Sequence, residues 1–229
     1  MEDILPEALI NNGVIAQNTI IMIMMLPIIA TIIGFVRHII GLKSLGLYAP
    51  IILTFAYFQL AVSIPSEKWI DRALYGFKIG IILTLVVFIT SYIAHWLTKK
   101  IRLHYFPKIA LILTAVAFSF YILIIIAHFT QKTTFLKSGF LPMILIATVS
   151  EQFVAIFVKK HFKTTFKLAS TTVITSYMAF LLVIYQPFQN LLILHPYLIF
   201  ITIIFNFVIG KFTGLRITEY IRFKSILRK

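Results

Sequence analysis

Residues 135–167 read FLKSGFLPMILIATVSEQFVAIFVKKHFKTTFK, an apolar stretch of membrane length that contains one carboxylate, Glu151. A charged Glu at mid-bilayer costs about 2.5 to 3.5 kcal/mol on insertion scales, so such a residue normally faces a bundle interior and marks function. As a helix, the stretch aligns Ala147, Glu151 and Ala155 on one stripe, where small residues let another helix approach. We therefore expect Glu151 to face protein, either as a hydrogen-bonded packing residue or as a functional one.

The composition is typical of a protein that crosses a membrane several times. Of 229 residues, 60% are hydrophobic and 12% are charged, whereas soluble domains have about 45 to 50% apolar and about 25% charged residues. The absence of cysteine excludes disulfides, thiolate metal sites and cysteine nucleophiles. The net charge of +14 comes from Lys and Arg at helix ends, where these side chains meet anionic lipid. We therefore expect membrane lipid as a partner, and no nucleic acid.

Seven apolar segments approach the roughly 17 to 25 residues that cross a bilayer as a helix. We expect these segments near residues 15–37, 47–65, 73–97, 107–128, 139–158, 168–186 and 189–210. The sequence thus predicts an all-α membrane protein with seven transmembrane helices in one domain, residues 15–210. A short extracytoplasmic tail, residues 1–14, should precede this domain, and a basic cytoplasmic tail, residues 211–229, should follow it.

The charges between the segments predict the orientation. Sixteen of the 21 Lys and Arg residues fall on one side of the membrane and five on the other, and the acids Glu2, Asp3, Glu7, Glu67 and Asp71 all fall on the less basic side. Cytoplasmic loops carry the excess of Lys and Arg. We therefore expect the N-terminus outside and the C-terminus in the cytoplasm.

A weak internal repeat relates two of these segments. Residues 41–59, GLKSLGLYAPIILTFAYFQ, and residues 135–152, FLKSGFLPMILIATVSEQ, share Leu-Lys-Ser, then Gly, then Pro before an apolar run. The segments lie three crossings apart, so a true repeat would be inverted: a 3+3 arrangement plus one helix, as in many transporters. The alternative is that many membrane helices begin in this way.

Polar residues recur at a similar depth in several segments. Glu151, Ser91 and Thr175 each lie eight residues from a basic residue at the cytoplasmic side, and Asn206 is slightly shallower. Together with His95 they could form an intramembrane polar site that opens inward. The alternative is that they form ordinary interhelical hydrogen bonds of about 0.6 kcal/mol each.

Enzyme motifs are absent from the sequence. There is no Ser-His-Asp set at a common depth, no pair of carboxylates within the membrane, no HExxH and no glycine-rich phosphate loop. The histidines are scattered over both ends of the segments, which argues against a metal site. We expect no catalytic residue, no metal and no cofactor.

Three stretches resemble a known family: GFLPMILIATVSEQF, YQPFQNLLILHPYLIF and GKFTGLRITEYIRFK. They resemble the bacterial seven-transmembrane domain that usually follows an inactive, periplasmic transglutaminase-like domain. Pro142, Met143 and Glu151 match one family element loosely. The element that matches closely consists of Gly210, Lys211, Phe212, Thr213, Gly214, Arg216 and Glu219. One departure is that about 14 residues precede the first segment, so we expect the transglutaminase-like domain to be missing.

The resemblance also implies a function. A more remote similarity is to the membrane subunit of poly-γ-glutamate capsule synthesis, and the seven-helix family is commonly associated with ATP-grasp ligases. This implies a non-enzymatic subunit of the bacterial inner membrane that partners a cytoplasmic amide ligase and guides an acidic peptide or polyglutamate-like product. The residues expected to dock the ligase are Lys211, Arg216, Arg222, Lys159 and Lys160. The alternatives are a secondary transporter with Glu151 as its proton or cation site, and a membrane anchor or receptor-like scaffold.

Overall fold

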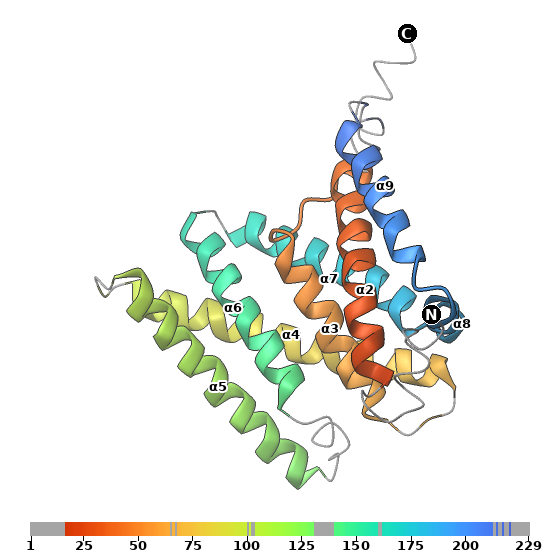
Figure 1. Ribbon diagram of the computed structural model, residues 1–229. Helices are drawn as coiled ribbons and strands as arrows, with labels where there is room; N and C mark the ends of the chain where they lie inside the picture. The colour runs from red at the N-terminus through yellow and green to blue at the C-terminus, as the bar shows by residue number, and fades with distance from the viewer. Residues whose placement is uncertain are drawn as a thin grey trace.

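The computed structural model describes residues 17–64, 66, 68–99, 101, 104–130, 140–159, 162–212, 214, 217 and 220. These residues form helices and no strands (Figure 1), which confirms the all-α class. In chain order the elements are α2 (Gln17–Phe35), the π-helix η2 (Val36–Ile40), α3 (Tyr48–Val62), α4 (Trp69–Lys99), α5 (Tyr105–Phe129), α6 (Leu141–Lys159), α7 (Phe162–Ile184), α8 (Gln186–Leu194) and α9 (Leu198–Lys211).

Five helical segments are long and apolar enough to cross a membrane, namely α2 continued through η2, α4, α5, α6 and α7. The expected seventh segment is not one straight helix: α8 and α9 are bent by 106° at a break that contains Pro196, because proline cannot supply a backbone hydrogen bond within a helix. The pair counts as a sixth span when it is taken as one broken crossing. The expected second segment is the apolar but short helix α3, with 15 residues. A count of seven complete crossings therefore stays a prediction.

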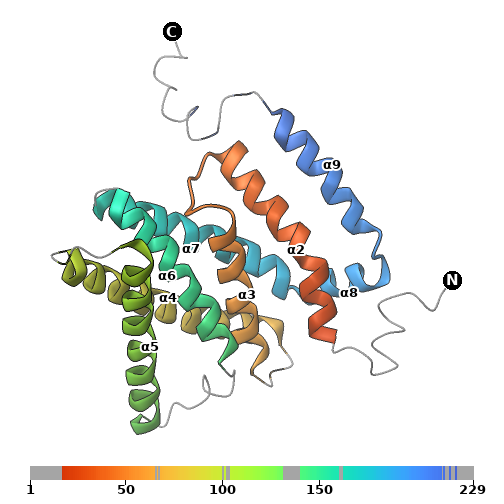
Figure 2. The same cartoon turned by 60° about the vertical axis from the view of Figure 1, so that its left-hand side comes forward.

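Helix α3 lies at the centre of the bundle and packs against α4, α6 and α7 (Figure 2). Its buried side chains include Leu53, Ala56, Tyr57, Phe58 and Leu60, which together cover most of its circumference. A helix that is apolar all round belongs inside a protein. This burial explains how so short a helix is held among longer ones.

The closest approach in the core lies between α3 and α4. A Cβ added at Gly76 would come within 2.7 Å of both the Ala61 Cβ and the Tyr57 carbonyl oxygen, and one added at Gly80 would come within 3.0 Å of the Tyr57 ring. The Thr84 hydroxyl donates to the Gly80 carbonyl at 2.7 Å and therefore accepts from the Tyr57 hydroxyl, at 3.0 Å. Small residues that let two backbones meet, combined with a buried hydrogen bond, are the usual way in which membrane helices associate.

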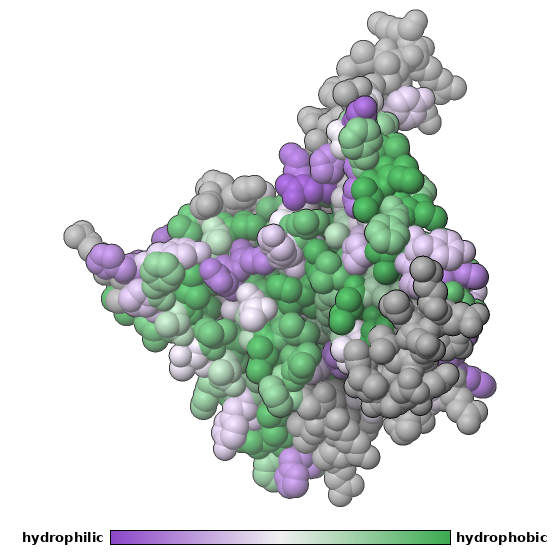
Figure 3. Space-filling view, in the orientation of Figure 1, coloured by the Kyte–Doolittle hydropathy of each residue, from purple (hydrophilic) through white to green (hydrophobic). Residues whose placement is uncertain are grey.

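The connections between helices gather basic residues at one end of the bundle. Figures 1 and 2 place the C-terminal ends of α2, α4 and α6 and the N-terminal ends of α3, α5 and α7 along the upper and left margins. In Figure 3 hydrophilic side chains gather around the C-terminal end of α2, against a mostly hydrophobic face. We call this side the basic end. Its basic members among the described side chains are Arg37, Lys43, Lys99, Lys108, Lys163, Lys167 and Lys211.

The two segments of the internal repeat fall on α3 and α6. These helices pack against each other and run in opposite directions (Figure 1), which is the relation that an inverted repeat requires. Pro50 lies in the first turn of α3 and Pro142 in the first turn of α6, where a missing backbone N–H is tolerated. The inverted repeat itself stays a prediction.

The Gly80→Ala substitution should destabilise the protein, because the added methyl group collides with the Tyr57 ring, which is fully buried. Overpacking of this kind costs about 1 to 3 kcal/mol. Gly210→Ala in α9 is the matched control, since nothing lies within 4 Å of its added Cβ. Thermal unfolding in detergent, followed by tryptophan fluorescence, measures both. Equal melting temperatures for the two variants would contradict the close approach of α3 and α4.

The basic end should lie in the cytoplasm, because cytoplasmic loops are the ones rich in Lys and Arg. The chain has no cysteine, so single-cysteine variants can be labelled without background. We expect Lys68→Cys, before α4, to react with an impermeant maleimide applied to intact cells, and Lys163→Cys, in the first turn of α7, to react only after lysis. The reverse pattern would mean that the protein is inverted.

Candidate functional site

Two of the expected polar-site residues, Ser91 and His95, lie one turn apart on α4. The Ser91 Oγ and the His95 Nδ1 are buried, and neither has a hydrogen-bond partner among the residues that the structure describes. The His95 ring stacks on Phe157 of α6, with ring centroids 5.9 Å apart and an interplanar angle of 22°. Buried polar atoms without partners are uncommon and cost free energy. Ser91 and His95 therefore mark an unsatisfied polar position where α4 meets α6.

Glu151 lies on the outside of the helix bundle, and the expectation that it faces protein is wrong within this chain. Its side chain is exposed, and no hydrogen bond or ion pair joins it to another described residue. The reason is the rotation of α6 about its axis. The buried side chains Ile146, Val149, Phe153 and Phe157 recur every three or four residues and form the inward face, and Glu151 projects from the opposite side.

Thr175 and Asn206 lie on two further helices. The buried Thr175 hydroxyl donates to the Thr171 carbonyl of its own helix at 2.8 Å. The Asn206 amide of α9 donates to the Thr31 hydroxyl of α2 at 2.8 Å, and Thr31 donates to the Pro27 carbonyl at 2.8 Å. Asn206 therefore makes an interhelical hydrogen bond, as the alternative interpretation proposes.

The five expected polar-site residues do not form a connected network in the described part of the chain. Ser91 and His95 share one face of α4, Asn206 bonds to α2, Thr175 bonds within α7, and the exposed Glu151 contacts none of them through a hydrogen bond. A single polar layer around Glu151 is therefore absent from this set of residues.

Of the residues expected to dock a partner, the structure places one side chain. Lys211 is exposed at the end of α9, with its Nζ 4.5 Å from the centroid of the Phe207 ring, a cation–π distance. Lys159 ends α6, but its side chain lies outside the described part, as do Lys160, Arg216 and Arg222. The docking surface therefore stays a prediction that Lys211 and the basic end support.

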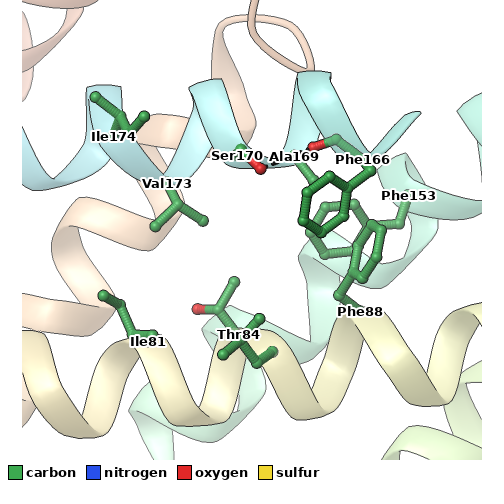
Figure 4. Close-up of a pocket in the computed structure, with 10 residues that line it drawn as sticks. Ile81, Thr84, Phe88, Phe153, Phe166, Ala169, Ser170, Val173 and Ile174 are labelled. Atoms are coloured by element: carbon green, nitrogen blue, oxygen red, sulfur yellow. Dashed lines mark hydrogen bonds between the residues drawn. The ribbon is translucent and has the colours of Figure 1, made fainter. Parts of the chain in front are cut away.

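An apolar cavity of about 220 Å³ lies between α4, α6 and α7 (Figure 4). Phe88, Phe153 and Phe166 close one side of it. The two hydroxyl groups in its lining, on Thr84 and Ser170, both donate to backbone carbonyls of their own helices, at 2.7 and 3.0 Å. With its polar groups already paired, the cavity suits an apolar chain better than a charged substrate.

A second apolar cavity, of about 400 Å³, lies between α2, α7, α8 and α9. Phe35, Leu182 and Phe205 are among its lining residues. Glu151 lines neither of these two cavities, and among the described side chains no three His, Asp or Glu residues come together as a possible metal site. Both cavities are lined mainly by apolar side chains.

The loop of residues 41–47 is hydrogen-bonded to α7, a contact that was not predicted from the sequence. The Leu45 N–H donates to the buried Thr172 hydroxyl at 2.9 Å, and the Thr171 hydroxyl donates to the Lys43 carbonyl at 2.5 Å. The signal in the sequence was the pair Gly41 and Gly46 on either side of Lys43. Both glycines adopt positive φ values, 88° and 105°, which other residues rarely adopt.

The unsatisfied position at Ser91 leads to a stability prediction. Ser91→Ala should leave the melting temperature unchanged or raise it, because the substitution removes a buried hydroxyl that has no partner. Thr84→Val is the matched comparison, since it leaves the buried Tyr57 hydroxyl unpaired and should cost about 1 to 3 kcal/mol. Thermal unfolding of both variants measures the difference. A Ser91→Ala variant that loses as much stability as Thr84→Val would show that Ser91 has a partner.

Comparison with known proteins identifies a family and no close relative. No curated protein and no solved structure matches the chain. One family sequence model matches residues 2–227, and its description is seven transmembrane helices usually fused to an inactive transglutaminase. Together with the apolar helices, this match shows a multi-pass membrane protein. The chain thus belongs to the family of seven-transmembrane-helix domains usually fused to an inactive transglutaminase.

Proposed function

We propose that this chain is a non-enzymatic subunit of the bacterial inner membrane that docks a cytoplasmic ATP-grasp-type amide ligase. The observation that carries the proposal is the basic end, where exposed side chains such as Lys43, Lys163 and Lys211 come from different connections in the sequence. A surface with one sign of charge attracts partners and ligands of the opposite sign. An acidic protein surface, or an acidic product, is the complement of this end.

A non-catalytic role agrees with the family. Its members are usually fused to a transglutaminase that is inactive. The family description therefore assigns no reaction to the membrane domain or to the domain fused to it. The cavities between α4, α6 and α7 and between α2, α7, α8 and α9 are lined mainly by apolar side chains. These surroundings can hold lipid or a neighbouring helix, and they offer no nucleophile with an adjacent base.

The exposed Glu151 supports a subunit over a solitary protein. A lone carboxylate within a span is costly when it faces lipid, by about 2.5 to 3.5 kcal/mol on insertion scales. A partner helix that offered a hydrogen-bond donor at this position would remove that cost. The transporter hypothesis rests on the inverted repeat and on Glu151 as a site inside the bundle. The exposed position of Glu151 removes the second support, and the repeat stays a prediction.

The class of the partner comes from the sequence resemblance, because the seven-helix family is commonly associated with ATP-grasp ligases. A ligase that adds glutamate produces an acidic chain, and such a chain would be drawn to the basic end by its charge. We propose that the subunit holds the ligase at the membrane and guides this product outward. The basic tail, residues 211–229, would make the first contact with the ligase.

Charge reversal on the docking surface should abolish binding of the cytoplasmic partner. We expect the triple variant Lys211→Glu, Arg216→Glu and Arg222→Glu to lose co-purification with the ligase at physiological salt, because like charges then face each other across the interface. Quantitative mass spectrometry of affinity-purified complexes measures the loss.

The matched control reverses charges that lie away from the basic end. Lys68 is the residue before α4, and Lys78 lies in the first third of that helix. Both side chains are exposed, so Lys68→Glu with Lys78→Glu should keep the ligase bound. Co-purification that persists in the triple variant, or that is lost equally in both variants, would refute docking through the basic end.

A further inference from the structure

A third cavity, of about 500 Å³, opens at the basic end and differs from the other two in its lining. Its polar wall consists of Arg37 and His38 of η2 and of Lys43 and Ser44 of the loop 41–47. No carboxylate is among the lining residues that the structure describes, so none of these neutralises the positive charges of the wall. A cavity with this wall is complementary to an anion.

The loop that carries Lys43 is fixed to α7 by hydrogen bonds on both sides of Ser44. The Lys43 carbonyl accepts from Thr171, 128 positions further along the chain, and the Leu45 N–H donates to Thr172, 127 positions further along. The Ser44 hydroxyl donates to the Gly46 carbonyl at 2.7 Å, which closes the turn. The position of the Lys43 backbone is therefore set by tertiary contacts.

The opposite part of the polar wall is fixed by the end of α2. The chain leaves α2 through the π-helix η2, and the Gly41 N–H donates to the Val36 carbonyl at 3.0 Å with φ of 88°. The His38 Nδ1 lies 3.1 Å from the Gly34 carbonyl and donates to it. π-Helical turns are rare and are frequently found at functional sites. Arg37 and His38 are thus held on a defined turn across from Lys43.

The chemistry of the wall suits a phosphate group. A guanidinium presents a fork of donors that matches the oxygens of phosphate, and a Lys ammonium adds a compact charge. The two unesterified oxygens of a lipid phosphodiester can accept from both Arg37 and Lys43. The His38 Nδ1–H is already paired with the Gly34 carbonyl, so the His38 Nε2 donates to the phosphate only when the ring carries both protons.

The other wall of the same cavity is apolar. It consists of the buried Leu45, with Ile156 of α6 and Leu168 of α7. The volume of about 500 Å³ lies within the range of about 300 to 1,000 Å³ for small-molecule sites, so a free phosphate ion would fill only a small part of it. An amphiphile with a phosphate at one end fits both walls.

We propose that this cavity binds the phosphate headgroup of an anionic membrane lipid. Arg37 and Lys43 hold the phosphate beside His38, and the glycerol and upper acyl carbons lie against Leu45 and Ile156. Basic pockets between transmembrane helices are known to bind lipid headgroups in this way. Lys43 also belongs to the basic end, whereas Lys211, the docking residue whose side chain the structure describes, does not line this cavity.

Native mass spectrometry of the purified full-length protein tests the proposal. The probe is dioleoylphosphatidylglycerol, with dioleoylphosphatidylcholine as the lipid of zero net charge and glycerol 3-phosphate as the soluble phosphate. We expect one tightly bound phosphatidylglycerol and at least about tenfold weaker binding to the double variant Arg37→Gln and Lys43→Gln, since each basic residue near a headgroup contributes about 1 kcal/mol.

The control variant removes two charges from the same end without touching the cavity. Lys99 and Lys167 are exposed and lie outside its lining, so Lys99→Gln with Lys167→Gln should bind phosphatidylglycerol within about twofold of the original protein. Equal losses in both double variants would mean general surface attraction and would overturn the site. Glycerol 3-phosphate that binds as tightly as the lipid would overturn the assignment to lipid. Unfolding temperatures in neutral lipid confirm that each variant is folded.

Discussion

The contact between α3 and α4 is the constraint on which the rest of the bundle depends. Gly76 and Gly80 bring α4 against the backbone and ring of Tyr57, and Thr84 accepts the Tyr57 hydroxyl. A hydroxyl within a membrane has no water to replace a lost partner. The same two helices then present their remaining faces to α6 and α7, so their spacing sets where the outer helices can lie.

Much of the fold follows from the sequence because helical membrane segments are encoded locally. The lengths of the apolar runs predicted the helices, and the acidic and basic residues predicted which helix ends lie together. Pro50 and Pro142 lie in the first turns of α3 and α6, and a proline at a helix start is a signal that neighbouring residues alone provide. The bend at Pro196 has a visible cause, but a proline within an apolar run is equally compatible with one continuous membrane helix, where proline is tolerated.

The orientation of side chains was harder to predict. Glu151 carries the strongest functional signal in the sequence, but its direction depends on how α6 is rotated against α3, and this rotation is set by Ile146, Val149 and Phe153. The bond between Leu45 and Thr172 joins residues 127 positions apart, so no local pattern could predict the loop that it fixes. Asn206 was correctly seen as polar within a span, and only the structure shows that its partner is Thr31.

The helices of this bundle differ widely in length: α4 has 31 residues and α9 has 14. At 1.5 Å per residue, α9 covers about 21 Å, less than the hydrocarbon thickness of about 30 Å, whereas α4 exceeds it and must tilt. Helix α9 packs on α2 at the rim of the bundle, and most of its side chains are exposed there. The resulting hydrophobic mismatch is therefore one-sided: lipid beside α9 must thin while lipid beside α4 need not, and the protein should favour the thinner regions of its membrane.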